Sequence, residues 1–229
     1  MQKVIEKMVK TQTPLTSCVI RDEYISASEI AFDCIFDGTS KFYPWELPKS
    51  LPKEFKIGVI VGSSGSGKST MLKHFGLEQS PEWNPEKSII SHFDSPEDGI
   101  KKLSSVGLNS VPSWYKPYHV LSNGEKFRAD LARKIKSNSV IDEYTSVVDR
   151  NVAKAASVSL SRYVKDNGIQ NVVLSTCHRD ILEWLEPDWV IDTDSGELID
   201  GFFLPDQKSN LTYIAQTMIV GECLATITI

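Results

Sequence analysis

The chain has 229 residues and a formal net charge of −5, and 41% of its residues are hydrophobic. This length suits one α/β domain with a small insertion, and the apolar fraction is enough to form a core. The acidic balance excludes a strongly cationic surface over the whole chain, so charge alone does not indicate nucleic-acid binding. No apolar run approaches the roughly 20 residues that span a membrane.

The cysteines form no CxxC pair and no Cys/His cluster, and the first ten residues are charged and amphipathic, unlike a signal peptide. We therefore expect reduced thiols, a cytoplasmic protein and no direct insertion into a membrane. The cysteines are Cys18, Cys34, Cys177 and Cys223.

The N-terminal quarter mixes strand-like runs with loop signals. Residues 19–20 and 30–32 are predicted strands, and the prolines of 43–52 favour a loop or an edge strand. A buried strand is predicted over 57–61, followed by a Gly/Ser loop and a helix over 68–75.

Helices and strands alternate through the rest of the chain. Ser95 and Pro96 predict a helix start, and Gly107 predicts its end. Further helices are expected over 122–135, 150–166 and 179–185, and further strands over 140–141, 171–177, 189–192 and 197–199. This alternation predicts a largely parallel sheet with helices on both faces.

The segment Gly62 to Thr70 reads GSSGSGKST and fits the pattern G-x-x-x-x-G-K-[ST] between a strand and a helix. Glycines let backbone N–H groups surround phosphate oxygens, and the helix N-terminus adds positive potential. Lys68 is expected to reach the β- and γ-phosphates of ATP, and Ser69 to ligate Mg²⁺. The predicted nucleotide-binding residues here are Gly62, Ser63, Ser64, Gly65, Ser66, Gly67, Lys68, Ser69 and Thr70.

An acidic pair, Asp142 and Glu143, ends the short apolar run 140–141. Two surface acids at a solvated strand end are the simpler interpretation of such a pair in isolation. Downstream of a phosphate-binding loop, Asp142 is expected to hold Mg²⁺ through water and Glu143 to act as general base. Ser139 stands where an apolar residue is expected, so this strand is short.

The segment Leu121 to Glu125 reads LSNGE and resembles the signature of ABC-type ATPases. Ser122 and Glu125 form an S-x-x-E capping box, and Gly124 allows a phosphate to approach the backbone. The resemblance implies that Ser122, Gly124 and Glu125 contact the γ-phosphate held by another subunit, in an ATP-dependent homodimer.

Two further segments follow in the order of that family. Residues 145–149, ending in Asp149, resemble the D-loop that comes just after the catalytic Glu in this family. His178 ends the next buried strand and resembles the switch histidine that contacts the γ-phosphate. Lys68, Glu143 and His178 are thus the expected catalytic residues. The resemblance covers about residues 55 to 203, and implies a P-loop NTPase sheet of the ABC ATPase type with an antiparallel β-subdomain.

A closer likeness links 106–114, 121–133 and 142–150 to a soluble bacterial and phage group of ABC-type ATPases, often joined to a predicted acetyltransferase region. It implies a non-transport ATPase. For the chain as a whole we expect an ATPase domain over 1–205. This domain has a β-rich part at 1–52 and a reduced helical insert at 76–120, and 206–229 stays unassigned.

The chain also departs from the family pattern. The interval between Lys68 and Leu121 is shorter than in transporter ATPases, which place a longer helical subdomain there. No Q-loop glutamine is evident, and a predicted strand over 88–92 puts His92 at the position of that glutamine. Phe36 and Tyr43 are both candidates for stacking on adenine.

The sequence therefore predicts a soluble, non-transport ATPase that hydrolyses Mg-ATP as a sandwich dimer, with an unidentified protein or nucleic-acid partner. The alternatives are the ATPase subunit of a membrane transporter and a non-catalytic ATP-binding switch.

Overall fold

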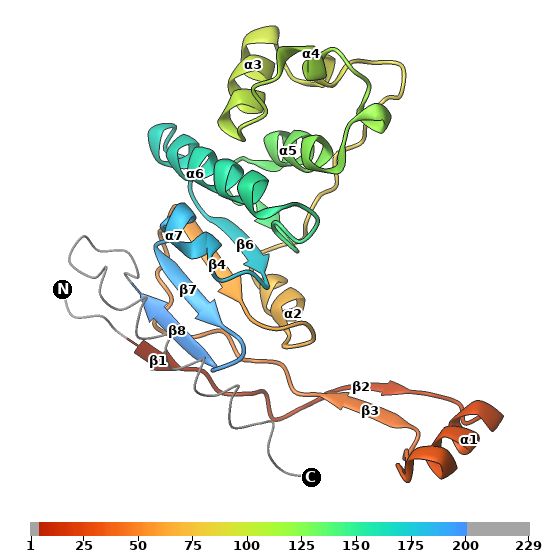
Figure 1. Ribbon diagram of the computed structural model, residues 1–229. Helices are drawn as coiled ribbons and strands as arrows, with labels where there is room; N and C mark the ends of the chain where they lie inside the picture. Colours follow the sequence, from red (N-terminus) through yellow and green to blue (C-terminus); the bar gives the residue numbers. More distant parts are fainter. Residues whose placement is uncertain (1–4, 201–229) are drawn as a thin grey trace.

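The computed structural model describes residues 5–200, which include a six-stranded sheet in the order β1-β8-β7-β4-β6-β5 (Figure 1). The four strands β7, β4, β6 and β5 run parallel, and β8 and β1 add antiparallel pairs at one edge. The strands are β1 (Ile5–Lys7), β4 (Ile57–Val61), β5 (Val140–Ile141), β6 (Val172–Thr176), β7 (Trp189–Asp192) and β8 (Glu197–Asp200). The predicted α/β fold with a largely parallel sheet is confirmed.

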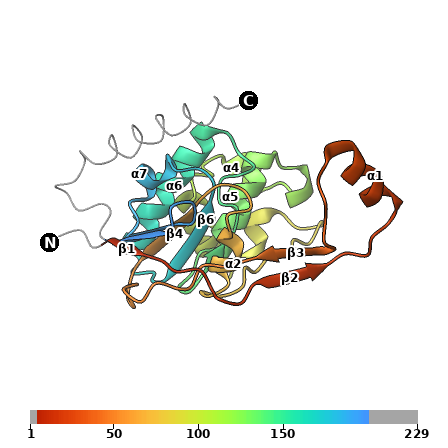
Figure 2. The same cartoon turned by 90° about the horizontal axis from the view of Figure 1, so that it is seen from below.

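Strand β4 is apolar and buried along its whole length, so the sheet is covered on both faces at this strand. Val59 and Val61 face a core made with α5 (Asn123–Lys134), α6 (Arg150–Asp166) and α7 (Ile181–Leu185). Ile60 faces a second core, which α2 (Lys68–Leu72) covers with Met71 and Leu72. Figure 2 shows α6 and α7 on one side of the sheet and α2 on the other.

A small helical part stands at one end of the molecule and carries α5 (Figure 1). It also contains η1 (Ile89–His92), α3 (Pro96–Ser105), α4 (Val111–Trp114) and η2 (Tyr118–Val120). Trp114 is buried there, and its indole N–H donates to the carbonyl of Leu108 at 2.7 Å. Asp130 of α5 accepts from Trp83 and Tyr118, both at 2.7 Å, which attaches α5 to the rest of this part.

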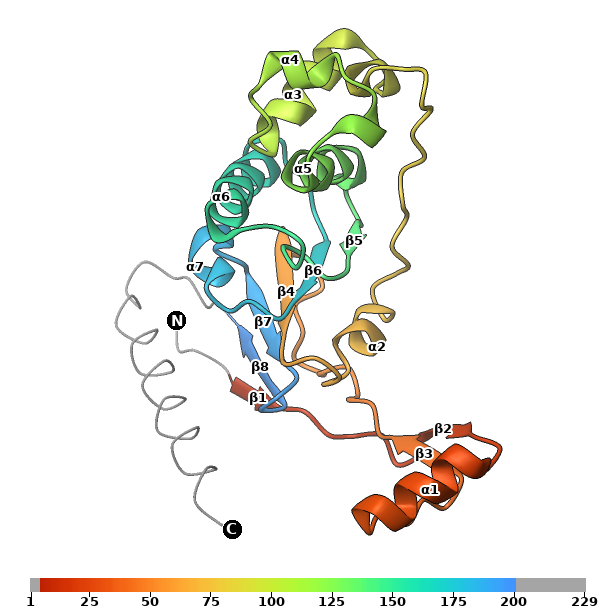
Figure 3. The same ribbon diagram turned by 45° about the vertical axis from the view of Figure 1, so that its right-hand side comes forward.

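An arm projects from the opposite end of the molecule (Figures 1 and 3). It consists of residues 15–42, with the antiparallel strands β2 (Leu15–Cys18) and β3 (Thr39–Phe42) joined through helix α1 (Glu23–Phe32). We call this segment the arm.

Most predicted elements are confirmed, including Ser95 as an N-cap and helix α6 with its predicted bounds. Three predictions are wrong. Residues 30–32 belong to helix α1, because Asp22 caps a helix there. Residues 19–20 follow strand β2 instead of forming one, and residues 89–92 form a 3₁₀ helix in place of a strand. Cys223 and the segment 206–229 lie outside the described residues.

None of the helices in residues 5–200 has both the length and the apolar character required to cross a bilayer.

Candidate functional site

The phosphate-binding loop follows β4 and leads into α2, as the sequence predicts. Gly67 sits at φ +97°, a left-handed conformation that disfavours other residues. A Cβ at this position would lie 2.6 Å from Cζ of Phe42, so the ring of Phe42 covers the loop at this glycine. Beside the loop is a cavity of about 430 Å³. Its lining comprises Phe42, Ser64, Gly65, Gly67, Lys68, Ser69, Thr70, Asp142, Glu143, Ser146 and Cys177.

Both backbone polar groups of Ser63, its carbonyl and its N–H, are hydrogen-bonded. Its carbonyl accepts from Nζ of Lys68 at 2.7 Å and from Oγ of Ser66 at 2.8 Å. Its backbone N–H donates to the carboxylate of Asp194 at 2.9 Å, and its hydroxyl donates to the same carboxylate at 2.7 Å. Asp194 therefore fixes the residue that orients Lys68.

Arg179 ties this arrangement to the segment that carries His178. Its guanidinium donates to Asp194 at 2.8 Å and forms a bidentate ion pair with Asp192. Burial alone would raise the pKa of Asp194, but the hydrogen bonds from Ser63 and the charge of Arg179 hold it below its ordinary value. Sequence reasoning missed Arg179 and Asp194, because they read locally as a helix start and a hairpin turn.

The carboxylate of Asp142 lies at the end of β5, beside the loop, and accepts a hydrogen bond from Ser175 of β6. Burial would raise the pKa of Asp142. The hydroxyls of Ser175 and Ser69, the N–H of Glu143 and the charge of Lys68 outweigh burial and lower it. An ionised carboxylate beside a serine hydroxyl is an oxygen donor set that suits Mg²⁺. The predicted metal ligands Ser69 and Asp142 thus lie together.

A strained turn presents Glu143 to the cavity. Its backbone has φ +49°, an uncommon conformation for a residue with a side chain. Tyr144, which is fully buried, anchors the turn: its N–H donates to the carbonyl of Ser175 at 2.7 Å, and its hydroxyl contacts Oγ of Ser157 at 3.0 Å. Glu143 itself is exposed and lines the cavity.

His178 follows β6 and contacts the turn after Glu143. Its Nδ1 lies 3.2 Å from Oγ1 of Thr145, so the histidine segment and the acidic turn are connected. Burial, and then the charge of Arg150, lower the pKa of His178 from its ordinary value, which favours the neutral ring. His178 is not among the residues that line the cavity of the loop, whereas the neighbouring Cys177 is.

The predicted capping box at the start of α5 is confirmed. The N–H of Ser122 donates to Oε2 of Glu125 at 2.9 Å, and the N–H of Glu125 donates back to Oγ of Ser122 at 3.3 Å. Ser113 also donates to Glu125 at 2.5 Å. The hydrogen bonds from Ser113 and Ser122 lower the pKa of Glu125 to about 2. Ser122 and Gly124 do not line the loop cavity of their own chain.

Asp149 caps helix α6, since its carboxylate accepts from the backbone N–H of Asn151 and Val152 at 2.9 and 3.0 Å. It too lies outside the loop cavity of its own chain. Val147, two residues before it, is 64% exposed, so this segment presents an apolar side chain to a partner or to solvent.

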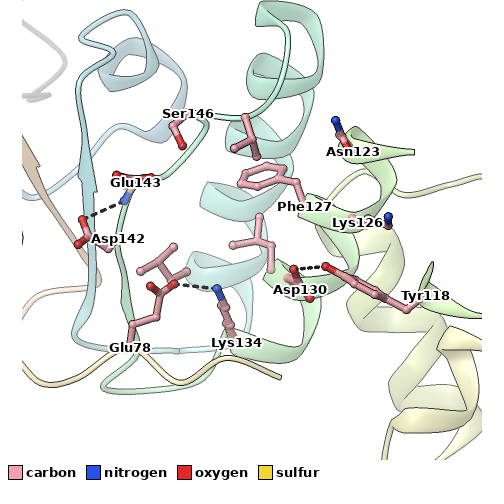
Figure 4. A pocket seen from close by; sticks show the side chains of 13 residues that line it. Glu78, Tyr118, Asn123, Lys126, Phe127, Asp130, Lys134, Asp142, Glu143 and Ser146 are labelled. Carbon is pink, nitrogen blue, oxygen red and sulfur yellow. Dashed lines mark hydrogen bonds and ion pairs between the residues drawn. The ribbon is translucent and has the colours of Figure 1, made fainter. Parts of the chain in front are cut away.

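A second cavity, of about 540 Å³, lies between α5 and the end of β5 (Figure 4). Phe127 and Tyr118 line it from the helical part, and Asp142, Glu143 and Ser146 line it from the sheet. These last three residues also line the loop cavity. Asp142, the predicted metal ligand, and Glu143, the predicted general base, therefore lie between the phosphate-binding loop and the helical part.

Of the two aromatic candidates for an adenine platform, neither lines the loop cavity, whereas Phe42 does. Tyr43 is the next residue on the hairpin, and Phe36 belongs to the far end of the arm. The predicted Q-loop equivalent, His92, is also away from this cavity. Its ring accepts from the N–H of Asn84 at 2.9 Å and packs edge-on against Trp83 in the helical part.

No family model matches the chain. It is similar to the energy-coupling factor transporter ATP-binding protein EcfA1 of Caldanaerobacter subterraneus subsp. tengcongensis. The two are 25% identical, over 76% of this chain and 79% of the relative.

Among solved structures, the chain resembles the ATP-binding cassette MJ0796 in a dimeric post-hydrolysis state bound to ADP and Pi. The TM-score is 0.51 and the identity 15%, over 82% of this chain and 94% of the other. It also resembles a chain described as a metal-chelate type ABC transporter in an inward-facing conformation. Here the TM-score is 0.50 and the identity 17%, over 70% and 77% of the two chains. The likeness to these structures shows that the chain has the fold of an ATP-binding cassette.

Proposed function

We propose that this chain hydrolyses Mg-ATP at a site that is completed by a second copy, with two ATP molecules held between two head-to-tail subunits. The observation that carries the proposal is the separation of two half-sites. Lys68, Ser69, Asp142 and Glu143 line the loop cavity, whereas Ser122, which caps helix α5, does not line it. The similarity to a dimeric cassette supports the same arrangement.

In the proposed reaction, backbone N–H groups of the loop and Lys68 bind the β- and γ-phosphates. Glu143 accepts a proton from a water molecule as that water attacks the γ-phosphorus, and the bond to the β-phosphate oxygen breaks to give ADP and phosphate. Ser69 and Asp142 would hold Mg²⁺, which neutralises the charge on the phosphates when bound. Thr145 holds His178 beside this turn, and the neutral ring can donate to the γ-phosphate.

The second subunit would supply Ser122 and Gly124 at the start of α5. The helix N-terminus offers unpaired backbone N–H groups to an anion. A Cβ at Gly124 would meet only Val152, at 3.6 Å, so substitution here is sterically tolerated. We assign the adenine platform to Phe42, because its ring borders the loop.

The test is the solution mass of Glu143→Gln by light scattering, with and without Mg-ATP. Loss of the base should trap ATP, so we expect a dimer with Mg-ATP and a monomer without it. Gly124→Asp in the same background is the matched control: it should bind ATP at its own loop but stay monomeric, because the carboxylate repels the γ-phosphate. A Glu143→Gln chain that binds ATP and remains a monomer would contradict the composite site.

A second candidate concerns the process that the ATPase drives. The relative named as a transporter ATP-binding protein supports an ATPase subunit of a membrane transporter over the soluble, non-transport group that the sequence suggests. The cavity beside α5 offers a place for a partner, since an inserted apolar side chain would touch both Phe127 and the catalytic turn. Co-purification with a polytopic membrane protein, abolished by Phe127→Asp, would support transport. A chain that purifies without a membrane partner and keeps its full ATPase rate would contradict it.

A further inference from the structure

The arm carries an unusual amount of exposed apolar surface. Ile20 is 92% exposed and Ile35 is 89% exposed, and Ile30 and Phe32 at the end of α1 are nearly as open. Helix α1 buries none of its ten residues. Contiguous exposed apolar surface is characteristic of interaction sites, and a helix of this length is marginal in water without packing.

The arm is nevertheless a built element, because its polar groups hold it together. The side chain of Glu29 is only 12% exposed; it accepts the N–H of Phe36 at 2.7 Å and pairs with Arg21. Asp22 caps α1 through the N–H of Ile25 at 2.9 Å. The carboxylate of Glu29 thus makes an inner contact while Ile20, Ile30 and Ile35 are exposed, which is the reverse of the pattern expected for an element that is stable alone.

The base of the arm lies at the rim of the phosphate-binding loop. Strand β3 ends at Phe42, whose ring covers Gly67. From there the arm extends away from the sheet, on the side of the molecule that carries α2 (Figure 3). A molecule that binds over the phosphate-binding loop would therefore lie next to the base of the arm.

The segment before the signature offers a complementary surface. Val111 at the start of α4, and Tyr115 and Val120 between α4 and α5, are exposed apolar residues, and Lys116 lies among them. Residues 111–120 include Lys116 and no acidic residue, and the carboxylate of Glu125, which follows them, is half-buried and hydrogen-bonded to Ser113 and Ser122. The arm is acidic: it has Asp22, Glu23, Glu29, Asp33 and Asp37 against Arg21 and Lys41.

We propose that the arm of each subunit binds the 111–120 segment of a second copy in the ATP-bound dimer. This inference rests on the proposed head-to-tail pairing. If the signature of one copy covers the loop of the other, the segment before that signature lies on the side of the loop from which the arm extends outward (Figure 3). Apolar side chains then meet apolar side chains, and the acids of the arm meet Lys116.

Two native cysteines allow the solvent exposure of the arm to be measured directly. Cys34 follows α1 and Cys18 ends β2, and both are exposed. Alkylation would be followed peptide by peptide by mass spectrometry on the full Glu143→Gln chain, with and without Mg-ATP. We expect Cys34 to be protected about tenfold or more only when the dimer forms. The Glu143→Gln/Gly124→Asp chain, which should bind ATP as a monomer, should show no protection of Cys34.

Substitutions on the two surfaces supply the second measurement. Phe32→Asp and Tyr115→Asp should each weaken ATP-dependent dimerisation of the Glu143→Gln chain by about tenfold, as loss of an apolar interface contact does. Val158→Asp, at an exposed apolar position on α6, should leave dimerisation unchanged. Binding of ATP to the monomer should be unaffected in all three.

The outcomes separate this inference from the proposed function. A dimer in which Cys34 reacts as fast as in the monomer, or in which Phe32→Asp has no effect, overturns the arm contact and leaves the ATP sandwich standing. Failure of the Glu143→Gln chain to dimerise overturns the sandwich, and the arm contact with it.

Discussion

Asp194→Ala should lower kcat/KM for ATP hydrolysis, because Asp194 fixes Ser63 and Ser63 orients Lys68. The carboxylate accepts from the N–H and the hydroxyl of Ser63 and from Arg179. A hydrogen bond to a charged group contributes about 1.5–3 kcal/mol when the partners are buried. The side chain of Asp194 is 38% exposed, so we discount for solvent screening and expect about 1–2 kcal/mol in total.

A loss of about 1.4 kcal/mol corresponds to roughly a tenfold fall in kcat/KM. We expect this mainly as a higher KM for ATP, because Lys68 binds phosphate in the ground state as well as in the transition state. Asp194→Asn keeps an acceptor for Ser63 but loses the charge that pairs with Arg179, so its effect should be intermediate. The assay is steady-state phosphate release against ATP concentration at saturating Mg²⁺.

Asp188 provides a matched control at the other end of the same strand. Its carboxylate also accepts two backbone N–H groups, from Lys56 and Ile57 at 2.7 and 2.9 Å, but at the start of β4. Asp188→Ala should lower the thermal midpoint and leave KM unchanged. If Asp194→Ala and Asp188→Ala alter KM to the same extent, Asp194 is only a structural residue and the reasoning is refuted.

Three further results are expected. Phe42→Ala should weaken ATP binding about tenfold in a calorimetric titration, because stacking on a base contributes about 1–3 kcal/mol, and Phe42→Trp should restore it. Gly58→Ala should cost about 1–3 kcal/mol in urea unfolding, because the new Cβ would lie 2.0 Å from Cζ2 of Trp189. The folded-state pKa of Glu125, at about 2, lies below its unfolded value of 4.5. Its stabilisation is therefore present above pH 4.5 and lost as the pH falls towards 2. Glu125→Ala should flatten the pH dependence of the unfolding free energy in that window.

Residues that follow strands were predictable because their signal is local. Lys68, Asp142 and His178 each come at a fixed place after an apolar run, and the neighbouring sequence shows where that run ends. The capping box of Ser122 and Glu125 is also a local pattern, and both of its hydrogen bonds are present.

The contacts that the sequence did not reveal are long-range ones. Ser63 and Asp194 are 131 positions apart, and only the pairing of β7 with β4 brings the turn after β7 to the loop. Nothing in a hairpin signal indicates that one of its acids binds a backbone N–H elsewhere. Arg179 is similar, since one of its partners, Asp192, ends strand β7 and the other, Asp194, follows that strand.

The arm misled the sequence analysis for a different reason. Its isoleucines suggested strands, but they are exposed, so the burial period that distinguishes helix from strand is absent. The sequence also offers no register by which Phe42, which lines the loop cavity, could be preferred to Phe36 or Tyr43. In a hairpin, neighbouring residues face opposite sides, so a shift of one position separates Phe42 from Tyr43.

The order of the central strands explains how the site residues come together at one edge of the sheet. Strand β4 carries the loop, and its neighbours β6 and β7 end at the same edge, where they deliver His178 and Asp194. Strand β5 has only two residues, yet pairing with β6 is enough to put Asp142 beside Ser175. Helix α5 does not line the loop cavity, although Asn123 and Phe127 line the neighbouring cavity with Asp142 and Glu143. A second copy that supplies this helix would complete the site, and ATP binding would then be coupled to association of the two chains.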